Sequence, residues 1–207
     1  MYCYILGAMS VNCFNFEITE NDIVIVADAG IKNAEKFNIT PDYIIGDFDS
    51  LGYTPTANNT ITHPIEKDDT DTMLAVKLGF EKGYRNFRIL GCIGGRLDHT
   101  FANIQTASYI VENKGNAIFF GNNENFAVIK NNKITFDKSN KGNISVFALE
   151  ECKNVNINGL HYELKNGCLS ENFPLGTSNK FNGNEATISV EQGKLLIIWE
   201  KQGDNNE

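Results

Sequence analysis

Compact apolar runs alternate with helix-like stretches along the first half of the chain. Four short runs of β-branched and aromatic residues predict buried strands at residues 23–27, 43–45, 87–90 and 117–120. Between them, helical spacing predicts helices through Ala34 and Phe37, over residues 70–82 and over residues 97–111. Gly83 follows the second of these helices as a typical C-terminal stop. This alternation predicts an α/β domain with an open, mostly parallel, Rossmann-like sheet covered by helices.

Both longer helices carry apolar side chains at spacings of three and four, as amphipathic helices do. On the helix at residues 70–82 this face contains Leu74, Ala75 and Leu78. On the helix at residues 97–111 the stripe is Leu97, Phe101, Ile104, Ser108 and Val111.

The second half of the chain changes to short apolar runs separated by turn signals. Runs at residues 144–149, 155–157, 186–190 and 195–199 predict strands. The turn signals are Asn158-Gly159, Asn166-Gly167, Asn182-Gly183 and Gln192-Gly193. This pattern predicts a smaller all-β sandwich domain. We therefore place two domains at residues 1–125 and 126–207.

Composition limits the classes of protein to which the chain can belong. Apolar residues make up 42% of the 207 positions, which is enough for a folded core. The net charge of −8, without a basic run, argues against a nucleic-acid-binding protein. No apolar stretch approaches the ~20 residues of a membrane-spanning helix, and we expect no secretory signal. The five cysteines form no C-x-x-C pair, which favours free thiols in a reducing cytoplasm over a zinc site.

Aspartates concentrate in the first half of the sequence. The positions that follow predicted strands or begin predicted helices are Asp28, Asp47, Asp49, Asp71 and Asp98. An open parallel sheet brings such positions to one edge, where ligands bind. Carboxylates at one edge repel one another unless a cation neutralises them, and Mg²⁺ prefers such oxygens together with waters and phosphates. We therefore expect a magnesium-dependent site for the phosphates of a nucleotide.

Individual residues of this set also have ordinary interpretations. Asp71 at a helix start would serve as a cap, and Asp28 as a solvated strand end. Asp47 and Asp49 form an Asp-x-Asp pattern that also occurs by chance in loops. His99 would be either an acid–base group or a capping or packed histidine. Convergence of several carboxylates on one edge is what favours the metal site.

A glycine-rich segment, residues 91–96, joins a predicted strand to a predicted helix. Its backbone N–H groups and the helix N-terminus would cradle a phosphate, which Arg96 would grip through two hydrogen bonds. The segment is not a P-loop, because the pattern G-x-x-x-x-G-K-[ST] is absent. The ordinary alternatives are a turn at Gly94-Gly95 and a surface salt bridge between Arg96 and a neighbouring acid.

In order along the chain, these segments resemble the thiamin pyrophosphokinase (thiamin diphosphokinase) family. The strong part covers residues 24–107, and a weaker match continues into the second half. Four ordered motifs at this spacing are far more specific than any one of them. The matching runs are Ala27-Asp28-Ala29-Gly30, Pro41-Asp42 with Gly46-Asp47-Phe48-Asp49-Ser50, Lys67-Asp68-Asp69-Thr70-Asp71, Gly94-Gly95-Arg96-Leu97-Asp98-His99 with Asn103, and, more weakly, Gly159-Leu160-His161-Tyr162, Leu164 and Gly176-Thr177-Ser178-Asn179.

The resemblance implies transfer of a pyrophosphoryl group from ATP to the hydroxyethyl oxygen of thiamin, giving thiamin diphosphate and AMP. It also implies Mg²⁺ and a homodimer with the active site near the protomer interface. By the same resemblance, the metal ligands are Asp47, Asp49 and Asp71, which act in catalysis together with Asp98. The residues implied for ATP are Asp28, Gly30, Ser50, Lys67, Thr70, Arg96 and His99, and those implied for thiamin are Ser178, Asn179 and Trp199. Either Asp71 or Asp98 would accept the proton of the alcohol.

Two positions qualify this resemblance. Ala29 stands where the family usually has glycine, and its methyl group is expected to restrict close approach of the backbone. Trp199 is the candidate for the aromatic side chain that the family often places under thiamin. A one-residue slip in register would turn it to the opposite face, and a core tryptophan is the alternative.

Three other functions fit parts of the pattern. Asp47-Phe48-Asp49-Ser50 also resembles the nucleophile motif of haloacid-dehalogenase-like phosphatases, which form a phosphoaspartate. A pyrophosphokinase acting on another alcohol, such as a pterin, is the second alternative. A non-catalytic sensor of nucleotide or thiamin is the third, although sensing does not require every acidic motif to be present.

Overall fold

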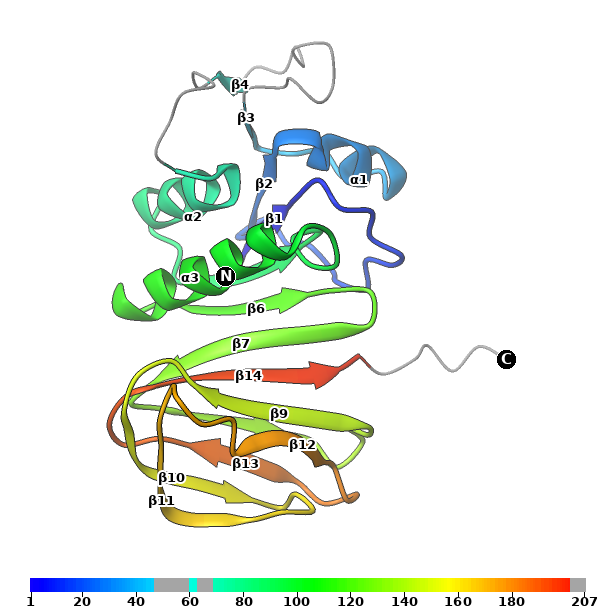
Figure 1. Ribbon diagram of the computed structural model, residues 1–207. Coiled ribbons are helices and arrows are strands. Elements are labelled where there is room, and N and C mark those ends of the chain that lie inside the picture. Colours follow the sequence, from blue (N-terminus) through cyan, green and yellow to red (C-terminus); the bar gives the residue numbers. More distant parts are fainter. Residues whose placement is uncertain (47–59, 63–68, 202–207) are drawn as a thin grey trace. The chain divides into compact units, whose positions relative to one another are not determined.

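The computed structural model describes residues 1–46, 60–62 and 69–201. The chain divides into two compact units between Asn122 and Asn123, slightly before the boundary inferred from the sequence. Among the described residues, every helix belongs to the first unit, and the strands of the second unit pair antiparallel (Figure 1).

The first unit is built on a parallel sheet, which has the strand order β6-β5-β1-β2-β3-β4 in the described part of the chain. The strands are β1 (Cys3–Leu6), β2 (Ile23–Ala27), β3 (Tyr43–Gly46), β4 (Thr60–Thr62), β5 (Asn86–Leu90) and β6 (Asn116–Phe120). The four strands predicted in this half are confirmed to within one residue at each end. Side chains on both faces of β1 and β2 are buried, which explains why these strands are apolar without alternation.

The central strand β1 has no counterpart among the predicted elements. It pairs with β2 on one side and β5 on the other, so that Cys3 lies opposite both Ile23 and Phe87. A run of four apolar residues is too short to be assigned from its pattern. Its central place brings the segment that follows it, from Gly7 onward, to the carboxyl edge of the sheet.

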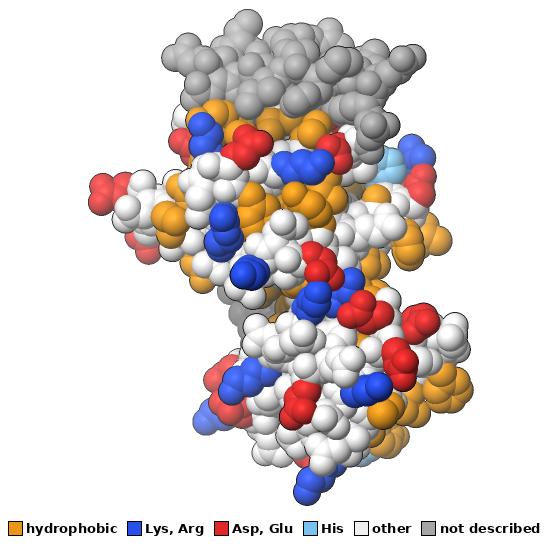
Figure 2. Space-filling model, turned by 90° about the vertical axis from the view of Figure 1, so that its left-hand side faces the viewer, with side chains coloured by type: hydrophobic (Ala, Val, Ile, Leu, Met, Phe, Trp, Pro, Cys, Tyr) orange, Lys and Arg blue, Asp and Glu red, His pale blue; other side chains and the backbone are white. Residues whose placement is uncertain are grey.

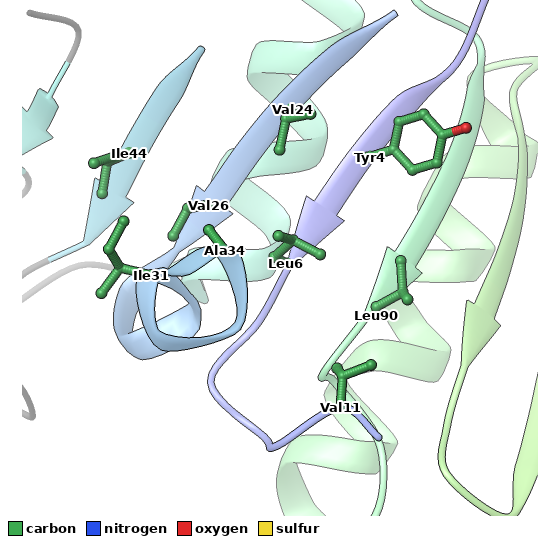
Figure 3. Packing of buried hydrophobic residues seen from close by; sticks show 9 residues of the cluster. All are labelled: Tyr4, Leu6, Val11, Val24, Val26, Ile31, Ala34, Ile44 and Leu90. Carbon is green, nitrogen blue, oxygen red and sulfur yellow. The ribbon is translucent and has the colours of Figure 1, made fainter. Parts of the chain in front are cut away.

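Helices lie on both faces of this sheet. They are η1 (Asp28–Gly30, a 3₁₀ turn), α1 (Ile31–Lys36), α2 (Asp71–Glu81) and α3 (Leu97–Glu112). Figure 3 shows α1 in front of the strands and the other helices behind them. The core on the α1 side consists of Tyr4, Leu6, Val11, Val24, Val26, Ile31, Ala34, Ile44 and Leu90 (Figure 3). Phe14 and Phe16, from the segment after β1, pack on Tyr4 and extend this core.

The predicted apolar stripe of α3 is not its buried face. The helix is confirmed, but Leu97 and Phe101 are 83% and 60% exposed. Its buried residues are instead Asn103, Thr106, Ala107 and Ile110. On α2 the buried residues are Ala75, Val76 and Gly79, which are smaller than the neighbouring leucines of its predicted apolar face. A Cβ on Gly79 would lie 2.6 Å from the ring of Phe87, so close packing on the sheet selects small side chains rather than the largest apolar ones.

The second unit contains two antiparallel sheets. In the described residues their strand orders are β12-β9-β14-β7 and β11-β10-β13-β8. The strands are β7 (Glu124–Lys130), β8 (Lys133–Phe136), β9 (Asn143–Ala148), β10 (Cys152–Asn158), β11 (Leu164–Leu169), β12 (Gly176–Lys180), β13 (Ala186–Ser189) and β14 (Lys194–Glu200). Rings from the two sheets meet in a shared core, where Phe136 lies edge-on to Trp199 with ring centroids 5.1 Å apart. The predicted β-sandwich is therefore confirmed.

One predicted turn of this unit is wrong. Asn166-Gly167 lies inside β11, where Asn166 has a φ of 49° and Gly167 pairs with Val155 across an irregular register. The positive φ produces a bulge in the strand rather than a reversal of the chain. The other Asn-Gly and Gln-Gly signals do lie between strands, at glycines with φ values of 74°, 83° and 113°.

Candidate functional site

A cavity of about 350 Å³ opens at the carboxyl edge of the parallel sheet in the first unit. Its lining comes from the segments that follow β1, β2 and β5 and from the first turns of α2 and α3. Open α/β sheets bind ligands at this edge, because successive loops there spread to either side of the strands. The cavity is therefore the candidate site of the first unit.

The cavity gathers several of the residues that the sequence analysis singled out. Those that line it are Asp28, Thr70, Asp71, Arg96 and His99. Asp47, Asp49, Ser50 and Lys67 lie outside the described residues. Ser178, Asn179 and Trp199 belong to the second unit.

The residues that follow β2 line the cavity and have an unusual backbone conformation. Asp28 has a φ of 50°, in the left-handed region that residues other than glycine rarely adopt. Gly30 approaches β1 so closely that a Cβ would lie 2.0 Å from the carbonyl oxygen of Leu6. Ala29, in contrast, is buried and does not have a positive φ. The methyl group at position 29 is therefore accommodated, and the expected restriction applies to Gly30 instead.

Thr70 and Asp71 have different roles at the start of α2. Thr70 is the N-cap, and its side-chain oxygen accepts a hydrogen bond from Met73 N–H at 3.2 Å. Asp71 is the first helical residue and lines the cavity. The side-chain cap, which was the ordinary interpretation of Asp71, is thus Thr70. The helix dipole favours a carboxylate such as that of Asp71 in the first turn.

The glycine-rich segment between β5 and α3 is shaped by close contacts. Gly91 has a φ of 71°, and a Cβ there would lie 2.6 Å from the carbonyl oxygen of Gly7. Gly94 has a φ of 94°. Asn103, which is buried on α3, donates a hydrogen bond of 2.8 Å to the carbonyl of Cys92 and so ties the segment to the helix. The loop is thereby tied to the N-terminal half of α3, and a helix N-terminus favours an anion.

Arg96 and Asp98 form an ion pair at the start of α3. Nη2 of Arg96 lies 2.5 Å from Oδ2 of Asp98, and Nε donates to Oδ1 at 3.1 Å. The Arg96 guanidinium bound to Asp98 holds the pKa of that carboxyl below its ordinary value, with a further hydrogen bond from the backbone of His99. Both side chains are largely exposed. Arg96 therefore forms the surface salt bridge that was its ordinary interpretation, and it also lines the cavity.

Several residues of the cavity were not predicted from the sequence, among them Gly7, Ala8, Met9 and Thr72. The first three follow β1, which was itself not predicted, so no pattern pointed to them. Burial raises the pKa of the Cys92 thiol to about 11, although its contact with Thr72 acts in the opposite direction. This thiol therefore stays protonated at neutral pH and is a packing group rather than a nucleophile.

The described residues supply only part of the expected metal site. Among them, no group of three or more His, Cys, Asp or Glu side chains could hold a metal ion. Asp28 and Asp71 line the cavity, and β3 ends at Gly46 on the same edge of the sheet. The carboxylate oxygens present are of the kind that Mg²⁺ prefers. The donor set is therefore compatible with magnesium, and Asp47 and Asp49, the other expected ligands, lie outside the described residues.

In the second unit, Ser178 and Asn179 lie on β12 but in different surroundings. Ser178 is exposed, has a φ of 58°, and donates from its backbone N–H to Oγ of Ser145. Asn179 is buried, and its amide exchanges hydrogen bonds of 2.9 Å and 2.7 Å with the backbone N–H and carbonyl of Tyr162. The hydroxyl of Ser178 is thus presented to solvent, whereas the amide of Asn179 holds the chain at Tyr162.

The register of β14 turns Trp199 into the sandwich. The residue pairs with Asn125 of β7 and Ile144 of β9, and its side chain is 7% exposed. Its indole packs edge-on against Phe136. Trp199 is therefore a core residue within the second unit, as the alternative interpretation expected, and its assignment to thiamin stays a prediction.

Charge is mixed on the surface that Figure 2 shows. On the face shown in Figure 2, Lys and Arg side chains are interspersed with Asp and Glu rather than gathered into one positive area. None of the helices in the described part of the chain combines the length and the apolar character that crossing a bilayer requires.

Comparison with known proteins identifies the family. A family model for the catalytic domain of thiamin pyrophosphokinase matches residues 14–120, and one for its vitamin B1 binding domain matches residues 131–195. The chain belongs to the thiamin pyrophosphokinase family. The catalytic-domain match includes most of the cavity lining but begins after Met9, and the vitamin B1 domain match includes Ser178 and ends before Trp199.

Individual thiamin pyrophosphokinases align over most of their length. Thiamine pyrophosphokinase of Bacillus subtilis (strain 168) is 27% identical over 187 residues, which cover 86% of this chain and 87% of that protein. The crystal structure of the Bacillus subtilis protein superposes with a TM-score of 0.85 at 23% identity, covering 98% of this chain and all of that one. The structure from Geobacillus thermodenitrificans gives 0.81 at 23% identity and 99% coverage of both chains. These structures show the same fold in both units.

Proposed function

We propose that this chain transfers a pyrophosphoryl group from ATP to the hydroxyethyl oxygen of thiamin, giving thiamin diphosphate and AMP. The observation that carries the proposal is the pair of family matches, which assigns a catalytic domain to the unit with the cavity and a vitamin B1 binding domain to the other. The protein is then a thiamin diphosphokinase, a transferase of thiamin diphosphate biosynthesis.

The products define the bonds that change. The alcohol oxygen attacks the β-phosphorus of ATP, the bond from that phosphorus to the oxygen bridging the α-phosphate breaks, and AMP departs. The alcohol gives up its proton. A displacement of this kind depends on positioning and on neutralisation of charge more than on covalent catalysis.

Arg96 and the glycine-rich loop are suited to hold the phosphates. They lie at the N-terminus of α3, where N–H groups and the helix dipole favour an anion. The pair between Arg96 and Asp98 is exposed to solvent, and such pairs contribute little stability. The guanidinium can therefore turn toward a phosphate at little cost, while Asp98 limits its orientations.

Asp71 is the described carboxylate that we assign to the metal. Together with Asp47 and Asp49, which the family resemblance supplies, it would hold Mg²⁺ at the edge of the sheet. When bound there, Mg²⁺ would neutralise charge on the phosphate oxygens. Asp28 lines the same cavity and adds to the negative potential that requires a cation.

The surroundings of the two candidate bases differ in a way that bears on proton transfer. The lowered pKa of Asp98 makes its carboxylate a weaker base, because the bound guanidinium stabilises the ionised form. We give Asp98 the task of orienting Arg96, and Asp71 and Asp98 stay the two candidates for the acceptor of the alcohol proton.

We extend the proposal to a homodimer with thiamin bound near the protomer interface. Each unit exposes large apolar side chains that a partner would cover, among them Leu97 and Phe101 in the first and Tyr162, Phe173 and Leu175 in the second. Exposed apolar side chains of this size are typical of interaction surfaces. The five cysteines are free thiols, which fits a cytoplasmic protein.

The test is product analysis by mass spectrometry after incubation with ATP, Mg²⁺ and thiamin. We expect AMP and thiamin diphosphate in equal amounts, and neither product without Mg²⁺. Release of inorganic phosphate from ATP without thiamin would instead indicate a phosphatase. Diphosphorylation of a pterin in competition with thiamin would indicate another acceptor, and no AMP under any condition would indicate a sensor.

A further inference from the structure

The side-chain amide of Asn33, on α1, makes three hydrogen bonds to the segment that follows β1. Its Nδ2 donates to the carbonyl oxygens of Gly7 and Met9, each at 2.8 Å. Its Oδ1 accepts from Val11 N–H at 3.0 Å. The side chain is 4% exposed, so these bonds are made out of contact with water. A buried amide with three bonds to a single segment fixes the path of that segment.

The same segment is held from its other side by β5 and the loop after it. Gly7 N–H donates to the carbonyl of Leu90 at 2.7 Å, and Met9 N–H donates to the carbonyl of Gly91 at 2.9 Å. The fit is close, because a Cβ on Gly91 would lie within 2.7 Å of the Met9 carbonyl oxygen and 3.1 Å from Nδ2 of Asn33. The backbone at Met9 is therefore clamped between α1 and the β5–α3 loop.

The Met9 side chain projects from this clamp into the wall of the cavity. It is 39% exposed and lines the cavity together with Ala8, Ala102 and Gly95. A Cβ on Gly95 would lie 2.7 Å from the Met9 sulfur, so the thioether occupies the space that a side chain at position 95 would need. Met9 thus covers the glycine-rich loop and presents a polarisable apolar surface to whatever enters.

We propose that Asn33 is a positioning residue for nucleotide binding: it holds Met9 over Gly95, where the thioether contacts the apolar part of the nucleotide. The inference rests on the proposed function, because it assigns the cavity of the first unit to ATP. Arg96 supplies a cation for the phosphates in the same cavity, whereas Ala8, Met9 and Ala102 supply apolar lining suited to a flat base.

Lys36 provides a matched control on the same helix. Its Nζ donates to the carbonyl of Val11 at 2.6 Å, so it binds the same segment as Asn33. Val11, however, is buried in the core on the α1 side of the sheet and does not line the cavity. In Figure 3 its side chain lies beside Leu90, away from the carboxyl end of β2. Loss of the Lys36 bond would loosen the segment without freeing the backbone at Met9.

The experiment compares Asn33→Asp, Met9→Ala, the double variant and Lys36→Met by steady-state kinetics. Asn33→Asp keeps the size and the acceptor but removes both donated bonds. We expect Asn33→Asp and Met9→Ala each to raise the KM for ATP roughly fivefold or more while the KM for thiamin changes less than about twofold. Lys36→Met should change neither KM more than about twofold.

The double variant separates positioning from general destabilisation. If Asn33 acts through Met9, adding Asn33→Asp to Met9→Ala should leave the KM for ATP unchanged, because the contact is already absent. Additive effects, equal rises in both KM values, or a fall in melting temperature with an unchanged KM for ATP would each overturn the inference. Met9→Ala alters a partly exposed side chain and is expected to fold, so an unchanged KM for ATP in this variant would suffice to overturn it.

Binding measurements keep this inference distinct from the proposed function. If the wild-type chain forms no thiamin diphosphate, the proposed reaction fails. The same variants are then titrated calorimetrically with a non-hydrolysable ATP analogue and Mg²⁺ in the absence of thiamin. Weaker binding by Asn33→Asp and Met9→Ala, but not by Lys36→Met, would support the inference, whereas equal binding by all of them would contradict it.

Discussion

Asp71 and Asp98 are both carboxylates in the first turn of a helix, but Asp71 lines the cavity whereas Asp98 does not. Asp98 is bound by the Arg96 guanidinium, which lowers the pKa of its carboxyl. Asp71 follows Thr70, whose side chain is the N-cap and accepts from Met73 N–H, and it lines the cavity from the first turn of α2. At the scale of single residues, function here depends on which partner each carboxylate has.

We expect Asp71→Asn to lower kcat by roughly 100-fold or more without unfolding the protein, because the amide supplies neither a charged metal ligand nor a base. The measurement is kcat at saturating ATP and thiamin over a range of Mg²⁺ concentrations, with circular dichroism to verify the fold. Asp137→Asn is the control, since Asp137 is an exposed residue of the second unit that accepts from Ser139 N–H. Normal turnover by Asp71→Asn at ordinary Mg²⁺ would remove Asp71 from both roles.

At the scale of elements, the residues at the ends of α2 set its length, and its small residues set its distance from the sheet. α2 begins at the Thr70 cap and stops before Gly83, which has a φ of 91°. Its small face, with Gly79 against Phe87, lets it lie close to the sheet. The first turn of α2, which carries Asp71, is therefore fixed by local contacts that can be tested separately from catalysis.

Thr70→Ala removes the side-chain acceptor for Met73 N–H and should destabilise the free protein by about 1 kcal/mol. For a chain of 207 residues the melting temperature should fall by about 2–4 °C. Thr70→Ser keeps a hydroxyl at the same position and should restore most of the loss. Differential scanning calorimetry without ligands would check both changes. Equal melting temperatures for the wild type and Thr70→Ala would show that the cap contributes nothing.

At the scale of the whole molecule, the two units carry different parts of the proposed reaction. The first unit contains the cavity with its acidic residues and Arg96, and the second exposes Ser178 on β12. Each unit has its own core, one beneath α1 and one between Phe136 and Trp199. Changes in one unit should therefore affect the binding of one substrate more than that of the other.

We expect Ser178→Ala to raise the KM for thiamin more than the KM for ATP, because the family match assigns vitamin B1 binding to this unit. The φ of 58° at Ser178 complicates the alanine variant, since alanine is strained there. Ser178→Gly relieves that strain and also lacks the hydroxyl. A rise in the KM for thiamin in both variants would assign the effect to the hydroxyl. Equal changes in both KM values would argue against a thiamin site in the second unit.

The alternation of strands and helices, the change to antiparallel strands and the ordered acidic motifs could all be inferred from the sequence. Each depends on residues close together in the chain, such as the apolar run of β2 or the motif Gly94–His99. Local pattern also placed Gly83 correctly just past the end of α2 and the start of the helix to within one residue. The motifs also pointed to the family, because several motifs in a fixed order rarely occur together by chance.

Other features were decided by tertiary structure, because they depend on contacts between residues distant in the sequence. Leu97 and Phe101 are exposed although they lie on the most apolar stripe of α3. The four residues of β1 became the centre of the sheet only through pairing with β2 and β5. Pairing of β14 with β7 and β9 turned Trp199 inward, and folding brought Asn33 to Gly7 and Met9. Sequence patterns record a residue's own preferences, whereas burial and hydrogen bonding depend on the neighbours that the fold supplies.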